Sequence, residues 1–287
     1  MRALHKDFGV EISNVDLREA ATYFTQIREA FETHSLLLFR NQILNDEDHL
    51  AFGRLFGAIE IREKNPQNQE ARLSIVSNLR KDGQLENEVS PRFMHQRANQ
   101  LWHTDSTFLP NPALANILTA RVIPSSGGAT EFVSTRVAWS ELSVRKRESI
   151  RNLVFLHRYA HSRRAVSEAA ANLDLVTMWP DTMWRATWRN PITGSEALYL
   201  ASHIYGVLGM NEREGQNLVN ELIKFSTEPH RVYRHHWLPG DVLVWDERAT
   251  MHRGTSWPYN EERTMASICI TASESDGLNQ IRPNLPN

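Results

Sequence analysis

The second half of the chain alternates short runs of strand-forming residues with turn-forming residues, and this pattern limits the fold more than any other feature. A turn sequence at 124–128 punctuates it, and an amphipathic, helix-like stretch over 134–175 interrupts it. The strand-like runs lie at 115–123, 130–133, 197–201, 241–245 and 264–271. Strands before and after a helical insertion predict a mixed, mainly β fold with an antiparallel core and flanking α-helices. No break in composition divides the chain, so we expect residues 1–287 to form a single domain.

The first sixty residues predict two helices around one buried strand. Apolar side chains recur at helical spacing over 17–33, and the run 34–40 is short and apolar. Asn45 precedes three acidic residues, which is typical of a helix start, and Gly57 is a suitable end.

Residues 61–100 are polar and irregular, apart from a short apolar run at 73–76. A stretch of this length inside a compact domain is usually functional. A lid or substrate loop and a long solvated excursion are both compatible with the sequence.

Composition excludes several classes of protein. Apolar residues make up 41% and charged residues 23%, as in globular proteins, and the formal net charge of −2 favours neither nucleic-acid nor membrane partners. The single cysteine, Cys269, cannot form an internal disulfide and fits a reducing compartment. The N-terminus has no apolar signal sequence, and no apolar run approaches the ~18 residues of a membrane span. We therefore expect a soluble, cytoplasmic protein.

A His-x-Asp pair at His103 and Asp105 is the central chemical feature. If 101–108 is a strand, both side chains point to the same face and could ligate one ion. A second histidine would complete a 2-His-1-carboxylate set, and His252 is the best candidate. That set leaves open positions on the metal and is typical of non-haem iron(II) oxygenases, whereas a zinc site with bound water is the competing interpretation.

Two further residues could bind an anion near such a metal. Arg263 lies eleven residues after His252 and could grip a carboxylate through its guanidinium. Thr130, after the turn at 124–128, offers a hydroxyl group for the same purpose. From the residues alone, a structural role for each is the alternative.

Several motifs in order along the chain resemble the taurine dioxygenase family, most closely its 2,4-dichlorophenoxyacetate dioxygenase branch. The resemblance covers nearly the whole chain and is densest at 98–106 (ANQLWHTDS) and 124–132 (PSSGGATEF). It resumes at 232–237 (VYRHHW) and 252–254 (HRG).

The resemblance implies a double-stranded β-helix (jelly-roll) core and an Fe(II)- and 2-oxoglutarate-dependent dioxygenase. O2 and 2-oxoglutarate would be consumed, succinate and CO2 released, and a C–H bond of a small-molecule substrate oxidised. Family members are commonly homo-oligomers, either dimers or tetramers. By position the implied site residues are His103, Asp105 and His252 as catalytic metal ligands, Thr130 and Arg263 on the far carboxylate of 2-oxoglutarate, and Trp245 as an aromatic beside the cosubstrate.

The substrate side departs from the family pattern at Ser267. Members that bind a sulfonate or carboxylate substrate carry a second arginine four residues after the cosubstrate arginine, where this chain has serine. Asn78 and His203 match substrate-side positions, although His203 could equally be a core histidine. The basic residues that could replace the missing charge are Arg62, Lys64, Arg163, Arg164 and Arg185, each with a solvated surface charge as the alternative. Trp179, Trp184 and Trp188 could line an aromatic pocket, with core packing as the default.

These features leave the substrate open. Ser267 favours a neutral or differently charged small molecule of specialised metabolism, which would be hydroxylated, desaturated or epoxidised. The alternative is a phenoxyacetate-type acid whose ether is cleaved after hydroxylation. A further alternative is a non-catalytic 2-oxoglutarate-binding jelly-roll protein, whereas zinc hydrolysis leaves Arg263 unexplained.

Overall fold

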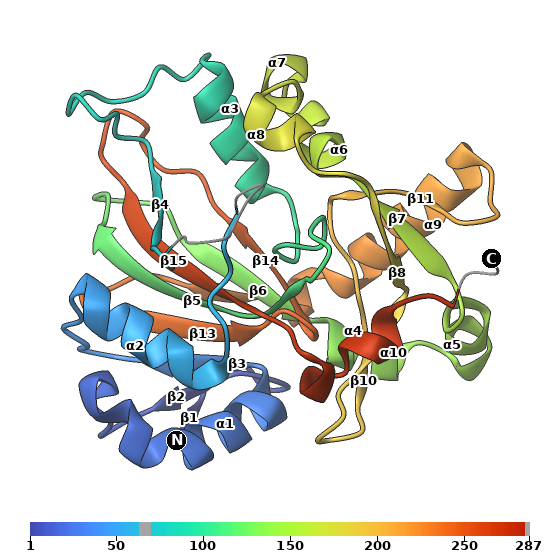
Figure 1. Ribbon diagram of the computed structural model, residues 1–287, viewed down its shortest axis with the longest axis horizontal. Helices are drawn as coiled ribbons and strands as arrows, with labels where there is room; N and C mark the ends of the chain where they lie inside the picture. The colour runs from blue at the N-terminus through green and yellow to red at the C-terminus, as the bar shows by residue number, and fades with distance from the viewer. Residues whose placement is uncertain (63–69, 285–287) are drawn as a thin grey trace.

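The computed structural model describes residues 1–62 and 70–284. Lys64, one of the candidate basic residues, lies outside the described residues. The fold is mixed, as predicted, and rich in β-sheet, with ten α-helices and fifteen strands in the described part (Figure 1).

A seven-stranded sheet forms the largest element. Its strands are antiparallel except for β2 and β3, which are parallel. In spatial order they are β1 (Arg2–Ala3), β2 (Val10–Ile12), β3 (Leu36–Phe39), β13 (Val242–Asp246), β5 (Ala113–Val122), β15 (Thr264–Thr271) and β4 (Ser74–Ser77).

A second, three-stranded sheet faces the first. It contains β12 (Tyr233–His235), β6 (Thr130–Ser134) and β14 (Thr250–Gly254), all antiparallel. Phe132 of β6 packs against Trp245 of β13, with ring centroids 5.2 Å apart. Two small sheets lie beside this pair: β11 (Ile204–Val207), β7 (Val154–His157) and β8 (Thr182–Arg185), and β10 (Glu196–Leu198) with β9 (Thr187–Arg189).

Alternation along the strands of the large sheet separates its two faces. Leu37 and Val244 belong to the cluster packed beneath α1 (Ala20–His34) and α2 (Asp46–Phe56). Their neighbours Leu38 and Trp245 point to the opposite face, toward the second sheet. Figure 1 shows α1 and α2 side by side along one side of the large sheet. The inner face is therefore shared by the two sheets, and the site lies there.

The two N-terminal helices form where the sequence predicts them. α1 follows a short 3₁₀ turn, η1 (Leu17–Glu19). α2 starts with a capping box in which Asn45 and Asp48 satisfy each other's backbone N–H groups, and it ends at Gly57. The other helices are α3 (Pro91–Arg97), η2 (Ala98–Gln100), α4 (Thr135–Glu141), α5 (Val144–Ile150), α6 (Tyr159–Arg164), α7 (Glu168–Ala171), α8 (Asp174–Thr177), α9 (Glu212–Ser226), η3 (Pro229–Arg231), η4 (Glu274–Asp276) and α10 (Leu278–Ile281).

The predicted helical stretch over 134–175 is wrong in its middle, because it is broken by strand β7. Val154–His157 pairs with both β8 and β11, so its backbone hydrogen bonds are made across strands rather than along a helix. The sequence over α4 and α5 has helical periodicity, and the four-residue strand that follows is too short to interrupt that pattern visibly.

The described residues 70–100 contain more regular structure than their polarity suggests. β4 forms an edge of the large sheet, and α3 packs against α7, which in turn contacts α6 (Figure 1). Residues of both elements line the central cavity, including Ile75 and His95.

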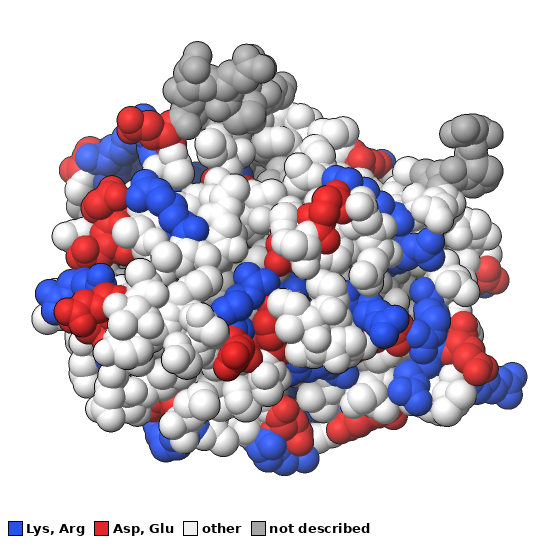
Figure 2. Space-filling model, turned by 60° about the horizontal axis from the view of Figure 1, so that its bottom comes forward, with Lys and Arg blue, Asp and Glu red and all other residues white. Residues whose placement is uncertain are grey.

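Charges of both signs are mixed on the surface of the protein. Figure 2 shows basic and acidic side chains interspersed over one face. Arg164–Glu168 and Arg158–Asp181 are two of the exposed ion pairs of the chain, and such pairs contribute little to stability. Among the described helices, none has the length and apolar character needed to cross a membrane.

Candidate functional site

His103 and His252 are joined by backbone pairing between two distant parts of the chain. Each residue's N–H donates to the other's carbonyl, at 3.0 and 2.8 Å, which forms an isolated antiparallel bridge. His252 lies on β14, so the bridge attaches His103 to the second sheet.

The expected strand over 101–108 is wrong: after the bridge the chain turns. Ser106 has a positive φ of 58°, and the N–H of Leu109 closes the turn on the Ser106 carbonyl at 3.0 Å. The side chains of His103 and Asp105 nevertheless converge, because the Asp105 N–H donates to Glu247 Oε2 at 2.9 Å and fixes the start of the turn.

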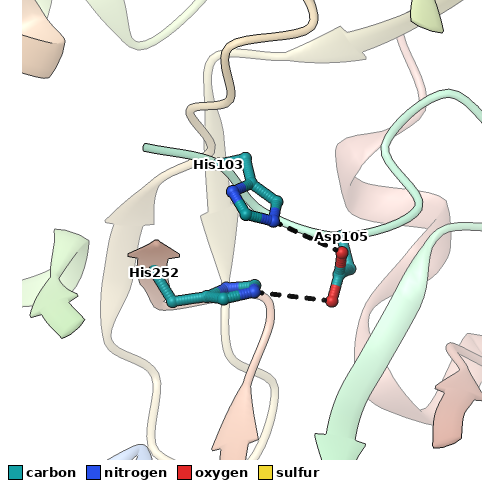
Figure 3. Close-up of side chains that lie close together, drawn as sticks. All are labelled: His103, Asp105 and His252. Atoms are coloured by element: carbon teal, nitrogen blue, oxygen red, sulfur yellow. Dashed lines mark ion pairs between the residues drawn. The ribbon is translucent and has the colours of Figure 1, made fainter. Parts of the chain in front are cut away.

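The three side chains meet at one point, as Figure 3 shows. One ligand atom from each of His103, Asp105 and His252 lies within 4.8 Å of the others. His103 Nε2 is 3.7 Å from Asp105 Oδ1, and His252 Nε2 is 3.6 Å from Asp105 Oδ2. These separations are too long for hydrogen bonds and leave space for a cation between the three groups.

Protonation in this cluster favours a metal. Burial lowers the pKa of His103, and it lowers that of His252 to about 3. Burial alone would raise the pKa of Asp105. The two imidazoles, Arg62 and Asn116 outweigh this effect, so the net pKa lies below the usual range. Neutral imidazoles and an ionised carboxylate are the forms that bind a divalent metal.

The hydrogen bonds of His103 lead to the same conclusion. Its Nδ1 lies 2.7 Å from the Leu101 carbonyl, so Nδ1 carries the proton of the neutral ring. Nε2 is then a lone pair that faces the Asp105 carboxylate. Two acceptors in that arrangement need a cation between them, and the donor set fits iron(II).

Asp105 is itself held by a chain of polar contacts. Asn116 Nδ2 donates to Asp105 Oδ2 at 2.7 Å, and Ser267 Oγ donates to Asn116 Oδ1 at 2.8 Å. Ser267, which the sequence places on the substrate side, thus donates its hydroxyl proton to Asn116. Asn116 and Glu247 were missed from the sequence, because neither belongs to a motif and only the fold brings them to Asp105.

We expect Asn116→Ala to weaken binding of Mn(II), an air-stable probe of the site, by about 10- to 100-fold, as is typical for loss of a residue that supports a metal ligand. The change removes the donor to Asp105 Oδ2. Ser267→Ala should have a smaller effect, since Ser267 contacts Asn116 and not the carboxylate. Calorimetric titration measures both, and wild-type affinity in Asn116→Ala would limit Asn116 to packing.

Arg263 is a buried cation at the start of β15. Its side chain has one polar protein contact, from Nε to the Gly128 carbonyl at 3.2 Å, and no acidic partner among the described residues. Burial lowers its pKa to about 10, so it remains charged at neutral pH. Gly128 has φ of 63°, and a Cβ there would lie 3.0 Å from Arg263 Nε, so glycine makes room for the guanidinium.

The other two cosubstrate candidates lie beside it in the cavity. Trp237 Nε1 donates to Thr130 Oγ1 at 3.0 Å, which leaves the Thr130 hydroxyl proton available to an anion. Trp245 packs against His252 with ring centroids 4.6 Å apart, and its indole N–H donates to Glu247 Oε1 at 2.6 Å. An unpaired guanidinium and a free hydroxyl proton fit the far carboxylate of 2-oxoglutarate.

One cavity of about 230 Å³ joins these groups to the substrate-side candidates. His203 lines it, and its Nδ1 lies 2.8 Å from Ser162 Oγ. Asn78 is buried behind Arg263, where its carbonyl accepts from the Arg263 N–H at 2.9 Å and its amide donates to the carbonyls of Tyr259 and Glu261. The side-chain polar atoms of Asn78 are therefore all used within the segment 259–263, and its carbonyl holds the Arg263 backbone.

The basic candidates separate into two groups. Arg62 and Arg163 line the cavity, while Arg164 is exposed and pairs with Glu168. Arg185 donates to the carbonyl of Arg282 and lies outside the cavity. The surface interpretation is wrong for Arg163, which is 4% exposed. Trp184 and Trp188 pack in the core, and Trp179 packs against the cluster around Phe108.

The fold and the site define a non-haem iron(II)- and 2-oxoglutarate-dependent dioxygenase, whose cofactors are Fe(II), 2-oxoglutarate and O2. Residues 1–269 match the family described as "Taurine catabolism dioxygenase TauD, TfdA family", and the chain belongs to it.

Individual relatives agree with this family. The chain is 30% identical to the alpha-ketoglutarate-dependent 2,4-dichlorophenoxyacetate dioxygenase of Cupriavidus pinatubonensis, over 91% of this chain and 94% of the relative. It is 30% identical to the (S)-phenoxypropionate/alpha-ketoglutarate-dioxygenase of Sphingobium herbicidovorans, over 91% of each. Among solved structures, AAD-2 in complex with Mn(II) and N-oxalylglycine superposes with a TM-score of 0.87 and 31% identity, over 96% of this chain and 98% of that one.

Proposed function

We propose that His103, Asp105 and His252 hold the iron(II), and that Thr130 and Arg263 bind the far carboxylate of 2-oxoglutarate. The observation that carries this assignment is the imidazole lone pair of His103 facing a carboxylate oxygen at 3.7 Å, in a cavity that also contains a buried, unpaired guanidinium. A zinc hydrolase would account for the first feature but would have no use for the second.

Iron(II) and 2-oxoglutarate, when bound, supply the oxidising chemistry that consumes O2, releases succinate and CO2, and oxidises a substrate C–H bond. The chain's own residues orient these components. Arg263 and Thr130 fix the far end of the cosubstrate by charge and hydrogen bonding. Trp245 covers the His252 ring and excludes water from that side of the cavity.

The substrate we propose is a small organic molecule with an aromatic ring, which is hydroxylated or, in variants of the same chemistry, desaturated or epoxidised. Phe108 and Tyr159 stack at 3.8 Å on the cavity wall, and His203 meets both rings edge-on. Such a wall suits an aryl group. The second candidate is an aryloxyalkanoate whose ether is cleaved after hydroxylation, which the substrates in the names of the two relatives favour.

We further propose that the two facing sheets form a double-stranded β-helix, supported by the inner-face cluster between them and by the structural neighbour. The single domain over 1–287, the homo-oligomeric dimer or tetramer, and the roles of Asn78, His203 and Ser267 toward substrate stay predictions.

A succinate-release assay tests the proposed function. Protein reconstituted with Fe(II), 2-oxoglutarate and ascorbate is screened against aryl acids, their neutral amides, amino acids and aromatic metabolites. We expect slow succinate formation without substrate and at least one aryl compound that accelerates it. Tight N-oxalylglycine binding with no succinate under any condition would support the non-catalytic binding protein instead.

A further inference from the structure

Four arginines of the described chain are buried. Two of them pair with carboxylates and two do not. Arg248 is bound by the carboxylates of Glu32 and Asp246, and Arg231 by those of Glu141 and Glu228. Arg263 and Arg163 have no carboxylate partner within residues 1–62 and 70–284, and both line the central cavity. Only the cavity therefore leaves buried guanidinium charges uncompensated in this part of the chain.

Arg163 lies on α6 and is surrounded by neutral groups. Its NH1 donates to Ser162 Oγ at 3.0 Å, and its NH2 donates to Tyr159 Oη at 3.1 Å and to Asn99 Oδ1 at 3.2 Å. Its Nε is buried without a partner. Neutral acceptors orient a guanidinium but do not offset the cost of removing its charge from water. A ligand that brings a negative charge would do so.

The surroundings of Arg163 place that ligand on the substrate side. Its guanidinium carbon lies 4.4 Å from the centre of the Tyr159 ring, whose stacking partner is Phe108. His203 contacts both aromatic rings and lies 6.3 Å, centroid to centroid, from His103. An anion at Arg163 would thus be held beside the aromatic wall, with the metal candidates at the other side of His203.

The position where related enzymes have a second arginine cannot supply this charge here. Ser267 occupies it and donates its proton to Asn116. Arg62, the other basic residue that lines the cavity, already pairs with Glu60. Arg163 is therefore the cavity guanidinium that is neither paired nor assigned to the cosubstrate.

We propose that Arg163 binds the carboxylate of an aromatic acid and selects it over neutral analogues, as the substrate clamp that Ser267 does not provide. This inference rests on the proposed function, because it assigns Arg263 to 2-oxoglutarate. The planar fork of arginine suits a carboxylate, and the Phe108–Tyr159 wall suits the ring attached to it. An acid is then favoured over the neutral substrate that Ser267 alone suggests.

Binding titrations on the full chain loaded with Mn(II) and N-oxalylglycine test the proposal. The probes are phenoxyacetate and its neutral isostere phenoxyacetamide. Wild type should bind the acid at least about tenfold more tightly, and Arg163→Gln should lose about 10- to 100-fold for the acid only, the range for a hydrogen bond to a charged group. The affinity of Arg163→Lys for phenoxyacetate should fall between those of wild type and Arg163→Gln, because lysine keeps the charge and loses the planar fork.

Arg164→Gln is the matched control, since Arg164 is the next residue on α6, is exposed and pairs with Glu168. It should bind both probes like wild type. Three outcomes would overturn the proposal: no preference of wild type for the acid, equal losses for acid and amide in Arg163→Gln, or no binding of phenoxyacetate at all. If Arg163→Gln does not fold, the wild-type preference and Arg163→Lys decide.

Different results would contradict the proposed function and the role of Arg163. Failure of N-oxalylglycine to bind Mn(II)-loaded wild type, or of succinate to form, would contradict the cosubstrate site. With those two results positive, the acid-to-amide comparison reports on Arg163 alone.

Discussion

His252→Ala is expected to abolish succinate formation, with a loss larger than the roughly 100-fold that follows removal of a residue that merely supports a ligand. The change deletes one of three groups that converge on a single point. Because a ligand that binds only the folded protein raises its stability, Mn(II) should raise the melting temperature of wild type and not that of the variant.

His34→Ala is the control for this experiment. It also removes one imidazole, but His34 ends α1 on the outer side of the large sheet. The melting temperature of His34→Ala should rise with Mn(II) as that of wild type does. Undiminished Mn(II) stabilisation of folded His252→Ala would show that the metal binds elsewhere.

Arg263→Met is expected to weaken ligand binding without destabilising the ligand-free protein. Removing a buried charge that pairs with a ligand carboxylate costs about 2–5 kcal/mol of binding free energy, so N-oxalylglycine affinity should fall by a factor of about 30 or more. The ligand-free protein should be no less stable, because it no longer buries a guanidinium without a carboxylate.

Calorimetric titration and chemical denaturation measure these two effects. Arg121→Met is the control, since Arg121 pairs with Asp46 at the surface and should leave N-oxalylglycine binding unchanged. Wild-type affinity in Arg263→Met would contradict the cosubstrate assignment. A large loss of stability in the ligand-free variant would instead indicate that Arg263 is structural.

The sequence predicts the metal cluster but not the reason it assembles. The spacing of His103 and Asp105 predicts a strand, whereas the structure has a bridge followed by a turn at Ser106. The two side chains still converge, since tertiary contacts with His252 and Glu247 fix the backbone just before the turn and at its start. Periodicity describes regular elements, and this segment is not one.

Residues without a motif could not be assigned from sequence. Asn116 and Ser267 are 151 residues apart and meet because β5 and β15 pair. Arg163 was indistinguishable from Arg164 in the sequence, since both are basic and adjacent. Only the packing of α6 separates them, with one guanidinium buried in the cavity and the other exposed.

We propose above that one cavity holds the metal on His103, Asp105 and His252 and the cosubstrate on Arg263. The most direct test is a crystal structure of the protein with Mn(II) and N-oxalylglycine, in which the anomalous signal locates the metal. We expect from this assignment one manganese peak between the three side chains, with the far carboxylate of N-oxalylglycine on Arg263 and Thr130. A manganese peak elsewhere, or a carboxylate that does not contact Arg263, would contradict it.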